Sequence, residues 1–142
     1  MTHRSRARRR SPETLFFAMN PEQLVPTEIS YHKKSRVLEV AFGEDMRCRL
    51  SAEFLRVHSP SAEVRGHGPG QEVLQIGKED VGIDRIEPVG NYAVRLFFDD
   101  GHDTGLYSWE ELQRFCRHSE ELWAEYLSRL ASAGHRHRSA GS

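Results

Sequence analysis

The chain has 142 residues, enough for one compact domain and too few for two of ordinary size. Its 20 basic and 21 acidic residues give a formal charge of −1, but residues 1–12 and 131–142 together hold seven arginines and no acid. Subtracting these seven leaves 13 basic against 21 acidic residues in the segment 13–130, a net charge of −8. An acidic body argues against a nucleic-acid-binding domain, and no apolar run approaches the roughly 18–20 residues of a membrane span.

Both ends of the chain are predicted to be disordered. Residues 1–20 form a basic N-terminal tail whose Arg- and Ser-rich stretch cannot bury an apolar face. Such a start is also typical of an organellar transit peptide, and translation from Met19 is a further alternative, so we expect a chain beginning at Met19 to fold equally well. Residues 131–142 form the second tail, which leaves residues 21–130 as the folded domain.

The first half of the domain is predicted to be a set of short strands. Residues 27–32 and 36–42 flank a turn at Lys33–Ser35, and in the second strand Leu38, Val40 and Phe42 share one face by strict alternation. A third strand covers residues 46–50. Ser51 then caps a helical turn over residues 52–56.

The second half begins with an irregular stretch from His58 to Gly82 that is rich in Gly, Pro and Ser. Strands resume at residues 83–88 and 91–98, where Tyr92, Val94, Leu96 and Phe98 alternate with other residues. Asp99-Asp100-Gly101 predicts a tight hairpin, because Asp-Gly accepts the positive φ angles of a type I′ turn. The return strand is expected at residues 103–107.

The C-terminal part of the domain is predicted to be helical. Ser108 and Glu111 have the spacing of a capping box, and Ser119 offers a second cap. Apolar side chains at helical spacing then indicate a core-facing stripe: Leu122, Trp123, Tyr126, Leu127 and Leu130. The fold class is therefore α+β, with small antiparallel sheets built from hairpins, two or three short helices, and a C-terminal helix packed on the sheet.

The two cysteines, Cys48 and Cys116, lie 68 positions apart and form no CxxC pair. A single disulfide is one possibility. The N-terminus has no apolar export signal, so we expect two reduced, half-buried thiols in a cytoplasmic protein.

Two groups of residues are candidates for a site. The loop Gly66-His67-Gly68-Pro69-Gly70 lacks the Gly-Lys-Ser/Thr ending of a nucleotide-binding loop, so it is either a set of tight turns or a backbone that a partner approaches closely. His58, His67, His102 and Asp103 carry donor types that suit iron or zinc. Adjacent strand residues point to opposite faces, however, so His102 and Asp103 also fit a structural role.

The sequence shows no nucleophile or paired acid and base in a recognisable local context, which argues against an enzyme. Residues 50–64, 66–70, 81–93 and 98–109 make the chain similar to a known family. It resembles the gamma-butyrobetaine hydroxylase-like N-terminal domain family, in its short stand-alone bacterial form, over about residues 27–130.

In the large hydroxylases this module precedes an iron- and 2-oxoglutarate-dependent catalytic domain, which the present chain is too short to contain. The resemblance also implies a zinc site made by three cysteines and a histidine. Carried over by position, the cysteines correspond to Ser59, Ser61 and Val64, and only the histidine is kept, as His102. A hydroxyl is a poor substitute for a thiolate and Val64 offers no donor, so this zinc site is expected to be absent.

We therefore expect a non-enzymatic binding or adaptor module without an obligatory cofactor. Because the family module is also found fused to iron–sulfur carrier ATPases, the resemblance implies such an ATPase or an oxygenase as protein partner. The expected contact surface comprises Gly66, His67, Gly68, Gly70 and His102. The alternative is a protein that binds iron or zinc through His58, His67, His102 and Asp103. The oligomeric state and the role of the tails stay open.

Overall fold

The structure is a computed structural model that describes residues 15–16, 25–66 and 70–138. Two antiparallel sheets are present in this part of the chain, one of order β1-β2-β3-β4 and one of order β5-β6-β7. The strands are β1 (Leu15–Phe16), β2 (Glu28–His32), β3 (Val37–Phe42), β4 (Met46–Ser51), β5 (Ile83–Val89), β6 (Ala93–Phe98) and β7 (Leu106–Ser108). The described helices are α2 (Ala52–Val57), α3 (Ala62–Arg65) and α4 (Trp109–Ser132). This architecture confirms the predicted α+β class.

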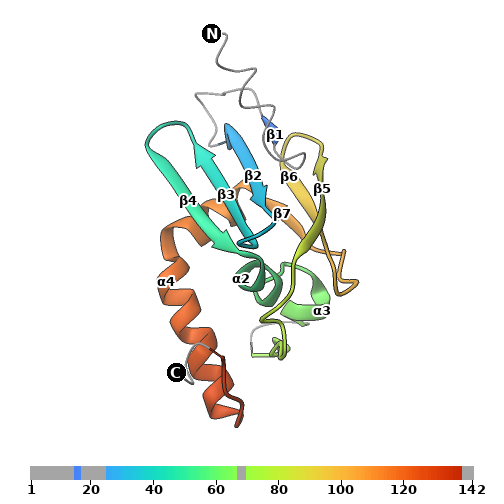
Figure 1. The fold of residues 1–142 in the computed structure, drawn as a ribbon, viewed down its shortest axis with the longest axis vertical. Coiled ribbons are helices and arrows are strands. Elements are labelled where there is room, and N and C mark those ends of the chain that lie inside the picture. Colours follow the sequence, from blue (N-terminus) through green and yellow to red (C-terminus); the bar gives the residue numbers. More distant parts are fainter. Residues whose placement is uncertain (1–14, 17–24, 67–69, 139–142) are drawn as a thin grey trace.

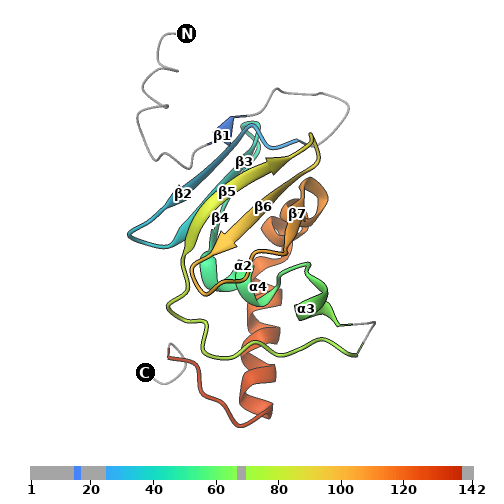
Figure 2. The same cartoon turned by 90° about the vertical axis from the view of Figure 1, so that its right-hand side faces the viewer.

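The two sheets share one core. Figures 1 and 2 show β2, β3 and β4 stacked against β5, β6 and β7, with α2 at the lower end of the strands and α4 beside β4. Buried side chains from both sheets and both helices form a single cluster, which includes Ile29, Val40, Leu55, Leu96 and Phe115. These apolar side chains are therefore removed from water only when the two sheets, α2 and α4 pack together.

The alternation predicted for β3 is confirmed, because Leu38, Val40 and Phe42 are all buried. In β6 the alternation holds from Val94 to Phe98. Tyr92 departs from the pattern: it lies in the turn before the strand and is 58% exposed. Its backbone carbonyl accepts a hydrogen bond from Trp109 N at 3.1 Å, which fixes the turn without burying the ring.

The tight turn predicted at Asp99–Gly101 is present. Gly101 N donates to Phe98 O at 3.2 Å, and Phe98 N donates to His102 O at 2.9 Å, so the chain reverses directly after β6. The turn is not of type I′, because only Gly101 of these three residues has a positive φ, +93°. The return strand was predicted too early, since β7 begins only at Leu106 and pairs with Ala93–Arg95. Before β7, the Asp100 carboxylate accepts hydrogen bonds from Arg56 and Lys78, and His102 is buried, so these contacts hold the residues between the turn and the strand.

Helix α4 begins and continues as the sequence indicates. Ser108 Oγ accepts a hydrogen bond from Glu111 N at 3.1 Å, the expected N-cap contact. The second cap at Ser119 coincides with a kink, since the preceding residue His118 has the non-helical angles φ −125° and ψ 23°. Beyond the kink, the predicted stripe packs inward, with Tyr126 and Leu130 buried against Val57.

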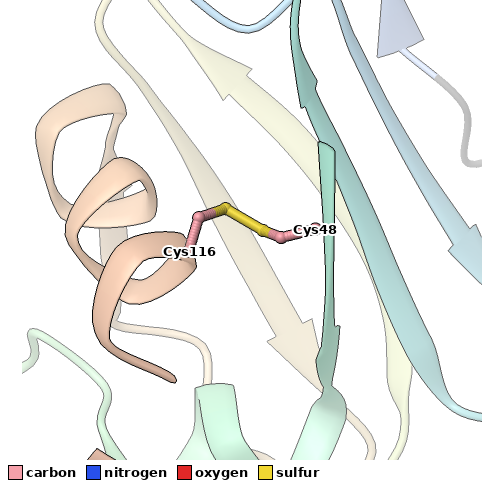
Figure 3. The surroundings of a disulfide bond; sticks show 2 residues. All are labelled: Cys48 and Cys116. Atoms are coloured by element: carbon pink, nitrogen blue, oxygen red, sulfur yellow. A yellow bond between two sulfur atoms is a disulfide. The ribbon is translucent and has the colours of Figure 1, made fainter. Parts of the chain in front are cut away.

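Helix α4 is joined to β4 by a disulfide between Cys48 and Cys116, whose Cα atoms lie 5.6 Å apart (Figure 3). The expectation of two reduced thiols was therefore wrong. The pairing could not be predicted from the sequence, because 68 positions separate the cysteines and only the packing of α4 along β4 brings them together.

The predicted C-terminal tail is ordered in its first part. Helix α4 extends to Ser132, and residues 133–138 turn back onto the domain. His137 Nε2 lies 2.7 Å from Glu53 Oε2, and its ring packs edge-on against Trp123. Two further contacts hold Arg138 at Asp80. These partners lie far away in the sequence, so local composition alone indicated disorder.

Of the predicted N-terminal tail, the structure describes only Leu15–Phe16, which pair with β2, and the other residues of 1–20 lie outside the described part. Among the helices described, none combines the length and the apolar character that a membrane span needs.

Candidate functional site

A chain of three side chains connects the β6–β7 loop to α2 and α3. Ser59, just after α2, places its Oγ 2.9 Å from His102 Nε2. Glu63, on α3, places its Oε1 3.0 Å from His102 Nδ1. Ser59 is 0% exposed and the His102 side chain only 2%, whereas the Glu63 side chain is 66% exposed. Both imidazole nitrogens therefore have partners, and the histidine is a buried cross-link.

The order serine, histidine, carboxylate is also that of hydrolase triads, but the arrangement here is inverted. A nucleophile must face the substrate, yet Ser59 is the buried end and Glu63 the exposed end. Ser59 Oγ also accepts a hydrogen bond from Ser61 N at 3.2 Å, and a side chain at Gly105 would contact the Ser59 hydroxyl. This geometry supports a structural role for Ser59 and not catalysis.

Charged side chains also hold the β6–β7 loop at Asp100. Burial tends to raise the pKa of Asp100, but hydrogen bonds from Lys78, His102 N and Arg56 outweigh it and lower the pKa to about 2. Burial, helped by the nearby Arg56 charge, lowers the pKa of His102, while Glu63 acts in the opposite direction. At neutral pH, Asp100 is therefore ionised and His102 is predominantly neutral.

The residues at the family's zinc positions do not fit a zinc ion. Ser59 Oγ is bonded to His102, and Ser61 Oγ lies 2.7 Å from Thr104 Oγ1 while also capping α3. Val64 is a buried apolar side chain. Two neutral hydroxyls, one bonded to His102 and the other to Thr104, therefore stand where zinc would need thiolates. The proximity of Ser59 and His102 nevertheless agrees with the positional correspondence.

The structure gives no support to the metal hypothesis within the residues it describes. His58 belongs to the aromatic core, with its ring centroid 4.4 Å from that of Phe54 and its Nδ1 2.9 Å from Phe54 O. Burial lowers the pKa of His58. Asp103 faces Arg95, and His67 lies outside the described residues. Over residues 25–66 and 70–138, no three His, Cys, Asp or Glu side chains gather in a way that could hold an ion.

The glycine-rich loop is described at its two ends. Gly66 has φ +73°, and a Cβ there would collide with the carbonyl group of Gln71, so only glycine fits. Gly70 also has a positive φ, +82°, but stands in open space. Tight turns therefore account for Gly66, whereas Gly70 is exposed at the start of the following segment. His67 and Gly68 lie outside the described residues.

The segment that follows, residues 70–77, presents apolar side chains on a fixed backbone. Val73 is 51% and Ile76 46% exposed. Val73 N donates to Val64 O at 2.8 Å, and Gln75 O accepts from Tyr126 Oη at 2.6 Å. Because the Gln75 side chain also receives a hydrogen bond from Arg56, the segment is tied to three elements although it has no regular structure. Sequence analysis missed this segment, since its two apolar residues form no periodic pattern.

A cavity of about 80 Å³ lies under this segment. Its apolar wall includes Val57, Val64, Leu74 and Tyr126. Its charged lining comprises Arg65, Arg114, Arg129 and Glu72. Cofactor pockets usually measure about 300–1,000 Å³. The cavity is therefore too small for a cofactor, but it is large enough for one side chain.

Comparison with known proteins identifies the family. The family model described as "Gamma-butyrobetaine hydroxylase-like, N-terminal" matches residues 29–113. No curated protein matches the chain. Two NMR solution structures are similar to the chain, each with a TM-score of 0.69. The first shares 53% identity over 79% of this chain and 88% of its own. The second shares 47% identity over 83% of this chain and 88% of its own.

A crystal structure of a DUF971-family protein of unknown function from Acidithiobacillus ferrooxidans is also similar. It shares 40% identity over 68% of this chain and 96% of its own, with a TM-score of 0.55. On the match over residues 29–113, the chain belongs to the gamma-butyrobetaine hydroxylase-like N-terminal domain family.

Proposed function

We propose that the chain is a non-catalytic protein-binding module that docks a partner protein through the 70–77 segment. The observation that carries the proposal is the exposure of Val73 and Ile76 on a backbone already fixed by hydrogen bonds. Covering these side chains with a partner would remove apolar surface from water. Because the backbone is ordered beforehand, the entropic cost of binding is reduced.

The loop held by His102 supports this surface from below. Arg56 bridges the two parts, since its Nε donates to Asp100 and its Nη1 donates to the Gln75 side chain. The imidazole of His102 is buried and does not itself face a partner. In this proposal His102 positions the surface, while Gly70, Val73 and Ile76 form it.

The proposed partner is an iron–sulfur carrier ATPase. Support for this class comes from the family association and is independent of the site geometry. An oxygenase is the other class that the association implies. The proposal needs neither a bound metal nor an active site in the module itself.

A binding experiment with purified proteins tests the proposal. The full chain and a purified iron–sulfur carrier ATPase are mixed, and the dissociation constant is measured by biolayer interferometry. The double variant Val73→Ser/Ile76→Ser is expected to weaken binding at least about tenfold, as loss of interface anchors does.

Tyr92→Ser is the matched control, because Tyr92 is also an exposed large apolar residue but lies at the β5–β6 turn. It should bind like the parent chain. Equal losses in both variants, or a parent chain that does not bind the ATPase, would overturn the proposal. Circular dichroism of each variant establishes that the fold is kept.

A further inference from the structure

We infer that the cavity beneath the 70–77 segment recognises an acidic peptide segment of the partner, with an aliphatic side chain in the cavity and a carboxylate at its arginine rim. This inference rests on the proposed docking function and deepens it by naming the chemistry of the partner. Three observations carry it: the charge of the cavity lining, the character of its wall, and its position under Val73.

The charge of this lining is opposite to that of the body. Residues 13–130 carry a net charge of −8, yet the lining holds three arginines and one glutamate, Glu72. Two of the arginines share one counterion, because Arg65 Nη2 and Arg114 Nη2 lie 2.9 and 2.6 Å from the same oxygen, Glu111 Oε2. A single carboxylate thus compensates two guanidinium groups, which leaves an excess positive charge at the rim.

Arg129 adds a second source of positive charge. It lies on α4 one turn beyond the buried Tyr126, lines the cavity and is exposed. A guanidinium with exposed N–H groups beside an apolar hollow is suited to a carboxylate, which it can bind through two parallel hydrogen bonds. On an otherwise acidic body, this rim would also steer an acidic segment toward the cavity and repel it elsewhere.

The apolar wall of the cavity favours the aliphatic side chain of the proposed peptide. Val57, Val64 and Leu74 are apolar, and the Tyr126 hydroxyl is already occupied, since it donates to Gln75 O. A volume of about 80 Å³ accommodates one aliphatic side chain. Val73, which also lines the cavity, continues the apolar surface outward to the exposed segment. A peptide with alternating aliphatic and acidic residues satisfies both the wall and the rim.

Two synthetic peptides test this inference on the full chain. One is an acetylated and amidated hexapeptide of alternating leucine and glutamate, and the other replaces each glutamate by glutamine. Binding is followed by ¹H–¹⁵N NMR titration. We expect saturable shifts of amides around Leu74 and Arg129 with the leucine–glutamate peptide and weaker binding of the leucine–glutamine peptide.

Charge reversal at the rim supplies the decisive comparison. Arg129→Glu should weaken binding of the leucine–glutamate peptide by about two- to fivefold, the effect of one lost exposed ion pair. Arg117→Glu is the control, since Arg117 is an exposed residue of the same helix that does not line the cavity. Equal binding of the two peptides, equal losses in the two variants, or no binding of either peptide would overturn the inference.

Failure here is distinguishable from failure of the docking function. If the peptides do not bind while Val73→Ser/Ile76→Ser still weakens binding of the ATPase, the 70–77 segment docks the ATPase through a contact of different chemistry. The acidic-peptide inference is then wrong and the proposed function stands.

Discussion

Ser59 Oγ and His102 Nε2 lie 2.9 Å apart although 43 positions separate the two residues in the sequence. Both side chains are buried, so their hydrogen bond fastens the β6–β7 loop to the end of α2. The resemblance to the large hydroxylases implies zinc ligands at these two positions. In the present chain a hydrogen bond joins them instead.

Ser59→Ala is therefore expected to destabilise the fold. The substitution leaves His102 Nε2 without its partner in a buried place, which costs about 1–3 kcal/mol of unfolding free energy. Urea denaturation measures the change. Glu63→Gln is the control. The Glu63 side chain is exposed, so water can replace its contact with His102, and this substitution should cost less unfolding free energy. A change below about 0.5 kcal/mol for Ser59→Ala, the range of ordinary surface substitutions, would contradict the structural role of the pair.

Asp100 is expected to make the protein acid-sensitive in a defined range. Its pKa in the folded protein, about 2, lies below the ordinary value of 3.8, so its contribution to stability is present above about pH 4 and is lost as the pH falls through 2. Asp100→Asn should lower stability at pH 7 and flatten the pH dependence between 4 and 2. Denaturation at several pH values tests this, with Asp103→Asn as control. Identical slopes for the parent chain and Asp100→Asn would refute the assignment.

Reduction of the Cys48–Cys116 disulfide is expected to lower stability without unfolding the domain. A cross-link over 68 residues restricts the unfolded chain and typically contributes about 2–4 kcal/mol. The comparison is thermal unfolding with and without a dithiol reductant, and Cys48→Ser/Cys116→Ser should match the reduced protein. If the reductant leaves the melting temperature unchanged while intact mass shows that two hydrogens are gained, this expectation is wrong.

The C-terminal residues are expected to stabilise the domain despite their polar composition. Burial raises the pKa of Glu53, while its hydrogen bond to His137 opposes the shift, so removing His137 leaves a buried carboxyl group without this partner. Truncation after Ser132 should cost about 1–3 kcal/mol, the cost of an unsatisfied buried polar group. Truncation after Arg138 keeps these contacts and should behave like the full chain. Equal stability of the two truncated chains would contradict the contact of His137 with Glu53.

Local patterns predicted most of the secondary structure. Strand alternation at Leu38, Val40 and Phe42 and the caps at Ser51 and Ser108 depend on near neighbours, so they are visible in the sequence. The turn at Asp99–Gly101 is also local and was predicted, but the return strand after it was placed too early. Arg56 and Lys78, which bind Asp100, are far away in the sequence.

The candidate site was harder to predict for the same reason. His58 has ligand chemistry, but it packs near Phe115 and Tyr126, which lie 57 and 68 positions away and which no local pattern connects to it. The proximity of Ser59 to His102 was available only through the family resemblance, which assigned both residues to one zinc site. The exposed side chains Val73 and Ile76 gave no signal, because exposure depends on what the rest of the chain leaves uncovered.

Hydrogen–deuterium exchange of the full chain, alone and with excess iron–sulfur carrier ATPase, tests directly whether the 70–77 segment docks this partner. We expect backbone amides of residues 70–77 to become protected in the mixture, while those at Tyr92 and Leu106, the other large apolar residues exposed in the described part of the chain, keep their rates. Protection confined to Tyr92 and Leu106, or no protection anywhere in the chain, would contradict the claim that the 70–77 segment docks this partner.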